Sequence, residues 1–184
     1  MPRYLAPLPD LISGFRIGLA VAFPLLAPQW RLPTVIVAGI SDGLDGFIAR
    51  RFGLQSVTGA MLDALADKAF TLSALLTLAA SGTISWWQLP LLLARDGAVV
   101  VIALYLMSVG NWRAFQRMMS GVPGKITTVL LFLWLISILI AFAGPAETAL
   151  FVMTAVASVA TAAIYLGKFL RALARDRRAR ALDQ

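Results

Sequence analysis

Residues 42–68 of the chain read DGLDGFIARRFGLQSVTGAMLDALADK. Apolar sequence surrounds the four aspartates of this stretch, Asp42, Asp45, Asp63 and Asp67. A charged side chain at the centre of a bilayer costs roughly 2.5–3.5 kcal/mol on insertion scales, so four without partners would cost on the order of 10 kcal/mol. A membrane chain tolerates them only if protons or cations neutralise them or if they face water. We therefore expect function to lie in this stretch.

The composition predicts an all-α polytopic membrane protein. The chain has 184 residues, is 60% hydrophobic and has a strongly positive mean hydropathy, which is typical of such proteins. We expect one domain over residues 1–184. The absence of Cys and His excludes thiolate catalysis and zinc sites built on these residues. Any metal would therefore have oxygen ligands, which suits Mg²⁺, Mn²⁺ or Ca²⁺.

Six apolar segments predict six transmembrane helices, since each is close to the ~20 residues that a bilayer crossing needs. Turn signals separate them, among them Pro28 and Pro33 around the first connection and Gly144-Pro145 before the last segment. The expected spans are 11–29, 32–50, 57–81, 86–109, 124–143 and 148–170.

Basic residues predict the orientation. One set of connections holds most of the arginines, and the opposite set holds Arg31 and Glu147. The positive-inside rule therefore places both termini in the cytoplasm, with Trp30, Trp86 and Trp87 at the outer interface. Residues 171–184 form a basic cytoplasmic tail attracted to anionic lipid. Nucleic acid is not an expected partner, because basic and aromatic residues do not interleave as a stacking platform requires.

Helical spacing predicts that the aspartates converge. Residues three or four apart share a helix face, so Asp42 and Asp45 lie on one face and Asp63 and Asp67 on another. A hairpin of the second and third helices would bring the four carboxylates together near the cytoplasmic side. Two divalent ions would balance them, and two-metal sites suit displacement at phosphorus. A proton or cation pathway through the same aspartates is the alternative from a different functional class.

Eight fixed positions in this stretch form the pattern Asp-x2-Asp-Gly-x2-Ala-Arg-x8-Gly-x3-Asp-x3-Asp. This pattern resembles the signature of the CDP-alcohol phosphotransferases, and the six-helix layout extends the resemblance to nearly the whole chain. The resemblance implies an integral-membrane enzyme, usually a homodimer, that displaces CMP from a CDP-linked alcohol with the hydroxyl of a second alcohol. The matched residues are Asp42, Asp45, Gly46, Ala49, Arg50, Gly59, Asp63 and Asp67.

The resemblance also implies roles for these residues. Mg²⁺ or Mn²⁺ ions would be bound by the four aspartates, with Asp67 also acting as the general base. The CDP moiety would contact Asp42, Gly46, Ala49, Arg50 and Gly59. The expected lipid donor is CDP-diacylglycerol, and the expected location is the cytoplasmic membrane of a bacterium, with the active site on the cytoplasmic side. A non-catalytic relative that only binds the CDP-lipid is a weaker alternative.

Three further places resemble the phosphatidylglycerolphosphate synthase and eukaryotic-type cardiolipin synthase branch. They are the Pro9-to-Arg16 opening, the charged pair Arg95-Asp96, and the run Gly124-Lys125-Ile126-Thr127-Thr128, in which Thr127 replaces a lysine of the synthases. The acceptor is therefore expected to be anionic: glycerol 3-phosphate first, with phosphatidylglycerol or an inositol phosphate as alternatives. Simple interfacial cations or a local salt bridge would explain the same residues without an acceptor. The candidate residues for the acceptor or lipid phosphate are Arg16, Arg95, Arg113, Arg117 and Lys125.

Overall fold

The computed structural model describes residues 8–52, 57–109, 122–141 and 144–182, with side chains over 11–41, at 59, and over 62–109, 123–141 and 144–174. Over this part of the chain the secondary structure is entirely helical, which confirms the all-α prediction. The chain divides into two compact units, one of residues 1–86 with 135–142 and the other of residues 87–134 with 143–184. The prediction of one domain over residues 1–184 is not tested by this division and stays a prediction.

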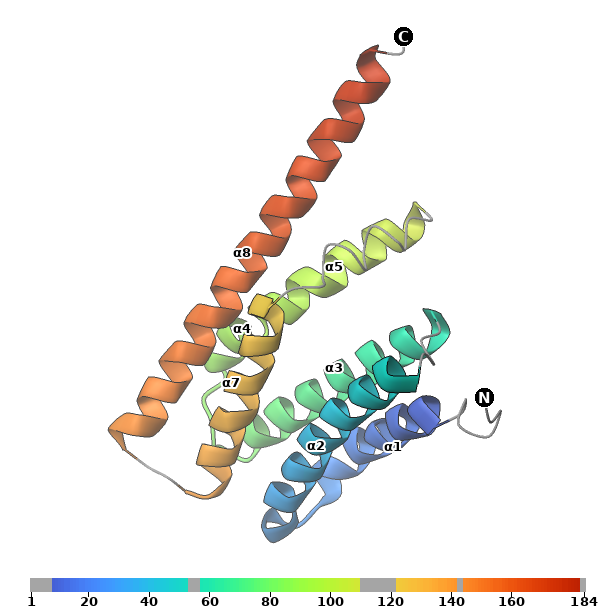
Figure 1. Cartoon of the computed structure of the whole chain (residues 1–184). Coiled ribbons are helices and arrows are strands. Elements are labelled where there is room, and N and C mark those ends of the chain that lie inside the picture. The colour runs from blue at the N-terminus through green and yellow to red at the C-terminus, as the bar shows by residue number, and fades with distance from the viewer. Residues whose placement is uncertain (1–7, 53–56, 110–121, 142–143, 183–184) are drawn as a thin grey trace. The chain divides into compact units, whose positions relative to one another are not determined.

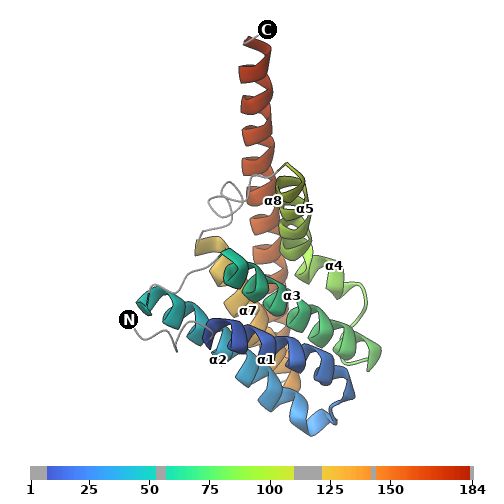
Figure 2. The same ribbon diagram turned by 90° about the vertical axis from the view of Figure 1, so that its right-hand side faces the viewer.

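The first unit contains three long helices that lie side by side (Figures 1 and 2). They are α1 (Leu8–Ala22), α2 (Pro28–Phe52) and α3 (Val57–Ala80), and a short 3-10 helix, η2 (Phe23–Leu25), follows α1 directly. The N-terminal helix α1 packs against both α2 and α3. Residues of α1 can therefore contribute to a site formed by the two aspartate-bearing helices.

Small residues on α1 and α3, and one aromatic pair between η2 and α3, lie where the first helix meets the third. Ala20 and Ala74 are buried, and such small side chains allow helix backbones to approach closely. Ser73 Oγ donates a hydrogen bond of 2.6 Å to the carbonyl oxygen of Ala20. The fully buried rings of Phe23 and Phe70 meet edge to face, with centroids 5.7 Å apart. These contacts fix the register of α1 along α3.

The second unit contains α4 (Gln88–Leu92), α5 (Ala94–Ser108), most of α7 (Val122–Leu139) and α8 (Pro145–Leu182). Helices α5 and α8 pack together along a cluster of buried residues, and the ring of Phe169 meets Tyr105 edge to face at 5.2 Å. The cluster consists of Ile102, Leu106, Tyr165 and Phe169.

The helices follow the expected spans with three differences. The span expected over 86–109 is two helices, because Leu93 leaves helical geometry (φ −89°, ψ 0°) between α4 and α5. Helix α2 already begins at Pro28, so Pro33 lies inside it rather than at its start, and it cannot donate the backbone hydrogen bond that the carbonyl oxygen of Gln29 would accept in a regular helix. The basic tail is not a separate segment, since α8 continues as a helix to Leu182.

One stretch of the described residues is long and apolar enough by itself to cross a bilayer, namely Pro145–Ala174 of α8. Two further apolar helical stretches, Leu11–Leu25 and Pro123–Leu139, are shorter. The arrangement of six spans with both termini in the cytoplasm is not confirmed by these lengths and stays a prediction.

Candidate metal and nucleotide site

The four aspartates lie at matching depths on α2 and α3. Asp42 lies ten residues before Phe52, where α2 ends, and Asp67 lies ten residues after Val57, where α3 begins. With a rise of about 1.5 Å per residue, each is about 15 Å from its helix end. At the other end of the same two helices, Arg31 Nη1 donates a hydrogen bond of 3.4 Å to Ser81 Oγ. The two helices therefore run antiparallel, and the backbone positions of the Asp42/Asp45 and Asp63/Asp67 pairs lie toward the same end of the unit.

Helix α1 supplies a cation to this region. Arg16 Nη1 donates to Asp63 Oδ1 at 3.0 Å, and Arg16 Nε donates to Ser41 Oγ at 3.5 Å. Ser41 directly precedes Asp42, and its own hydroxyl donates to the carbonyl oxygen of Ala38 at 2.8 Å. Arg16 thus contacts both helices that carry the aspartates. Its predicted role in binding an acceptor or lipid phosphate stays a prediction; in the structure it is 1% exposed and pairs with Asp63.

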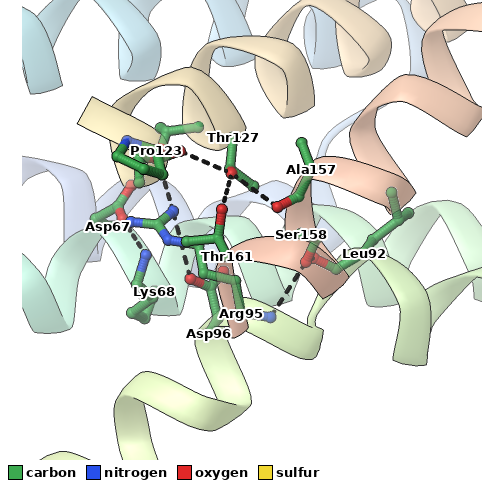
Figure 3. A network of polar contacts seen from close by, with 12 residues as sticks. Asp67, Lys68, Leu92, Arg95, Asp96, Pro123, Thr127, Ala157, Ser158 and Thr161 are labelled. Carbon is green, nitrogen blue, oxygen red and sulfur yellow. Dashed lines mark hydrogen bonds and ion pairs between the residues drawn. The ribbon is translucent and has the colours of Figure 1, made fainter. Parts of the chain in front are cut away.

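Asp67, the predicted general base, pairs with the next residue. Lys68 Nζ donates to Asp67 Oδ2 at 2.7 Å (Figure 3). Both side chains are largely buried. One oxygen of the carboxylate is thus held by a cation. The other oxygen is the atom that a metal or a proton would use.

The remaining predicted metal and CDP residues are placed as backbone only. Asp42, Asp45, Gly46, Ala49 and Arg50 lie on α2, but their side chains are outside the described ones. Gly59, which is described, lies in the first turn of α3. No group of three or more His, Cys, Asp or Glu side chains that could hold a metal occurs among the side chains that the structure describes. The donor set nevertheless fits a hard divalent cation, because carboxylates are its preferred ligands and both aspartate pairs lie at one depth.

In the second unit, Arg95 is the centre of a polar network (Figure 3). Its Nη1 donates to Thr128 Oγ1 at 2.8 Å and lies 3.6 Å from Asp96 Oδ1. Its backbone N–H donates to Ser158 Oγ at 3.1 Å, and that hydroxyl donates to the carbonyl oxygen of Leu92 at 2.8 Å. Arg95 Nε is buried and has no hydrogen-bond partner among the described residues. The local salt bridge with Asp96 therefore leaves one donor of the guanidinium unused.

Gly124 brings α7 close to this network. A Cβ at this position would lie 2.5 Å from Tyr165 Oη and 3.3 Å from Arg95 Nη2. Only glycine fits without displacing one of these groups. The exposed side chain of Lys125 follows at the next position, so the start of α7 places a second cation close in sequence to the residue that Arg95 contacts. Arg113 and Arg117 lie outside the described residues.

Thr127, which stands where the synthases carry a lysine, is buried. Its hydroxyl lies 3.1 Å from Thr161 Oγ1 and can donate to the carbonyl oxygens of Pro123 and Ala157 at 3.0 and 3.4 Å. The position therefore faces α8. A lysine here would have to move its ammonium group out of these contacts to meet an acceptor.

A stripe of hydroxyl groups on α8 was not predicted from the sequence. Thr154, Ser158 and Thr161 are almost completely buried and, with Tyr165, recur every three or four residues. Small polar residues at this spacing in an apolar helix are a signal of helix–helix contact, and it was available in the sequence. Two of them, Ser158 and Thr161, contact the backbone of Arg95 and the side chain of Thr127.

Comparison with known proteins identifies one family. A family model described as CDP-alcohol phosphatidyltransferase matches residues 6–166. A Streptomyces coelicolor protein named "Cardiolipin synthase (CMP-forming)" is 37% identical over 105 residues, covering 52% of this chain and 49% of that protein. A Cereibacter sphaeroides protein named "CDP-diacylglycerol--glycerol-3-phosphate 3-phosphatidyltransferase" is 35% identical over 106 residues, covering 53% and 48%. The chain thus spans about half or less of the length of the curated relatives it matches.

Proposed function

Because the chain belongs to the CDP-alcohol phosphatidyltransferase family, we propose that it transfers the phosphatidyl group of CDP-diacylglycerol to the hydroxyl of an anionic alcohol and releases CMP. The observation that carries this proposal is the placement of two aspartate pairs at equal depth on the antiparallel helices α2 and α3. A transporter would not require the glycines, alanine and arginine that complete the eight-residue pattern.

We propose that Asp42, Asp45, Asp63 and Asp67 hold two divalent ions, Mg²⁺ or Mn²⁺. When bound, these ions would offset the negative charge that develops on the phosphoryl oxygens and on the departing CMP. Asp67 accepts the proton of the attacking hydroxyl, because the chain has no His or Cys to do so. The hydroxyl oxygen bonds to the phosphatidyl phosphorus as the bond from that phosphorus to CMP breaks. Gly46, Ala49, Arg50 and Gly59 contact the CDP moiety.

The distribution of side chains supports a membrane location. In the described parts of both units, many large apolar side chains are exposed on the helices, while several hydroxyl side chains and the charged side chains of Arg16 and Asp96 are buried beside the apolar core, which suits lipid around the helices. Examples are Leu65 and Val156, each 62% exposed, against Arg16 and Ser158, at 1% and 0%. Together with the basic connections, this pattern supports six spans in a bacterial cytoplasmic membrane, with both termini and the active site on the cytoplasmic side. A homodimer stays a prediction from the family resemblance.

For the acceptor, we propose glycerol 3-phosphate, with phosphatidylglycerol as the second candidate and an inositol phosphate as the third. The buried Nε of Arg95, which lacks a partner among the described residues, would be satisfied by a phosphate oxygen. Lys125, Arg113 and Arg117 would add positive charge around that phosphate. Relatives named for the reactions with glycerol 3-phosphate and with cardiolipin as product both match the chain. The acceptor therefore has to be determined by identifying the product of the reaction.

The test is an acceptor screen with purified protein in lipid nanodiscs. Labelled CDP-diacylglycerol and Mg²⁺ or Mn²⁺ are supplied with each acceptor in turn, and the product is identified by mass. We expect CMP release that depends on the divalent ion and on one acceptor. Release that persists in a metal chelator, or no release with any alcohol, would contradict the proposal.

Asp63→Asn and Glu147→Gln form a matched pair of variants for this screen. Asp63 is a proposed metal ligand, whereas Glu147 accepts a hydrogen bond of 3.1 Å from Trp134 Nε1 in the second unit, which an amide oxygen can also accept. We expect Asp63→Asn to lower CMP release by at least about 100-fold, since it removes a charged ligand. Glu147→Gln should leave the rate within about twofold, in line with the small effects of substitutions away from such features.

A further inference from the structure

We propose that Arg16 is a positioning residue for the metal site: it fixes the carboxylate of Asp63 on α3 and the segment of α2 that begins at Ser41 in a single geometry. The inference rests on the proposed function, because it assigns a supporting residue to the proposed metal ligands. It differs from the role predicted for Arg16 from the sequence, which was contact with a phosphate.

Burial separates these two roles. Arg16 is 1% exposed, so it offers almost no surface to a phosphate arriving from outside. Arginine remains protonated in proteins and is rarely buried without a partner. In the pair with Asp63, the arginine side chain is 1% exposed and the aspartate side chain 42% exposed. The guanidinium is therefore anchored inside the helix bundle, while the carboxylate that it holds remains open on one side.

Two different nitrogens of the guanidinium contact two different helices. Nη1 reaches Asp63 Oδ1 at 3.0 Å and Nε reaches Ser41 Oγ at 3.5 Å. Only one oxygen of Asp63 is used in this contact, so the second can serve a cation. A planar fork with several fixed donors can link two helices in this way, whereas the single nitrogen of a lysine cannot hold both partners in the same geometry.

The contact on α2 lies next to the proposed ligands. Ser41 precedes Asp42 by one residue and Asp45 by four, which is the spacing of one helical turn. Helix α1 itself is fixed along α3 by the Ser73–Ala20 hydrogen bond. Arg16 therefore stands on a fixed helix and ties the two aspartate-bearing segments to each other.

Whether removal of Arg16 weakens or tightens cation binding distinguishes a positioning residue from one that only balances charge. A positive charge beside a cation site repels the cation, so a residue that only balanced charge would weaken binding, and its removal would tighten it. A residue that orients the ligands has the opposite effect. Loss of groups that orient metal ligands typically weakens metal affinity by about 10–100-fold.

The experiment measures Mn²⁺ binding to the purified full chain in detergent, with no CDP-lipid present, from the electron paramagnetic resonance signal of free Mn²⁺. We expect Arg16→Gln to weaken binding by about 10–100-fold. Ser41→Ala, which leaves every charge in place, should weaken it by about fivefold, the equivalent of one hydrogen bond. Arg16→Lys should fall between Arg16→Gln and the wild type. The KM for Mn²⁺ in the CMP-release assay should rise in the same order.

Arg31→Gln is the matched control, because Arg31 makes a similar bond to a serine at the far end of α2 and α3. It should leave Mn²⁺ affinity unchanged. Tighter Mn²⁺ binding by Arg16→Gln would overturn the inference. Unchanged Mn²⁺ binding by both Ser41→Ala and Arg16→Lys would also overturn it. If Arg16→Gln does not fold, these two variants alone test the inference. Wild-type chain that binds no Mn²⁺ would overturn the proposed function as well, whereas wild-type binding with unchanged variants would overturn this inference alone.

Discussion

At the scale of single residues, the approach of α7 to Tyr165 and Arg95 depends on the absence of a side chain at Gly124. The backbone of α7 meets the hydroxyl of Tyr165, which is 2% exposed and cannot turn away into open space. The same approach places Thr128 against Arg95. A glycine in an apolar helix would otherwise be a weakness, since it adds no packing and loses more backbone freedom on folding. Here it permits the network around Arg95.

We expect Gly124→Ala to lower the free energy of unfolding by about 1–3 kcal/mol, because the new Cβ would lie 2.5 Å from Tyr165 Oη. In Gly124→Ala/Tyr165→Phe the clashing oxygen is gone, so the double variant should be more stable than Gly124→Ala alone. Thermal unfolding of the four proteins in detergent measures the coupling. Equal destabilisation by Gly124→Ala with and without the Tyr165 hydroxyl would contradict this explanation.

At the scale of elements, α1 is the helix that unites the first unit, since it packs against both α2 and α3. From the sequence, α2 and α3 were expected to form a hairpin whose aspartates converge, and no structural role was predicted for α1. The structure adds α1 to that hairpin and supplies Arg16 from it. The reason is that α1 and the 3-10 helix η2 directly after it carry small and aromatic residues that pack against α3, Ala20 on α1 and Phe23 on η2.

Phe70→Ala tests this contact. Phe70 is completely buried against Phe23, so its truncation should lower the free energy of unfolding by roughly 3 kcal/mol. Leu72→Ala, two residues away and 44% exposed, should change it by less than about 1 kcal/mol. Thermal unfolding of both variants in the same detergent gives the comparison. Similar losses for the two would mean that α1 does not hold α3 through this aromatic pair.

At the scale of the whole molecule, the proposed six spans have a direct test, because the natural chain contains no cysteine. Thr83→Cys, in the exposed turn after α3, should react with a membrane-impermeant maleimide applied to intact cells. Gln184→Cys, at the opposite end of the predicted topology, should react only after the membrane is opened. The reverse pattern, or labelling of both from outside, would contradict cytoplasmic termini.

The family is the prediction that the comparisons confirm most directly, since the family model covers residues 6–166. Eight residues in one stretch sufficed for it, because they match the signature that the chain resembles at every fixed position. The acceptor could not be read in the same way. The residues expected to recognise it lie far apart in the sequence, and Thr127, the position where the chain departs from the synthases, is buried in a helix contact.

The sequence by itself determined the helical class, most helix boundaries and the equal depth of the two aspartate pairs, because these follow from local apolar runs and from the fixed rise of a helix. Only the tertiary structure decided that Arg16 contacts Asp63 and Ser41, that Thr127 is buried, and that Gly124 lies against Tyr165. These contacts join residues 25 to 47 positions apart in the chain. Which face of one apolar helix meets another depends on side-chain packing between helices, and an almost uniformly apolar sequence carries little periodic signal for that choice.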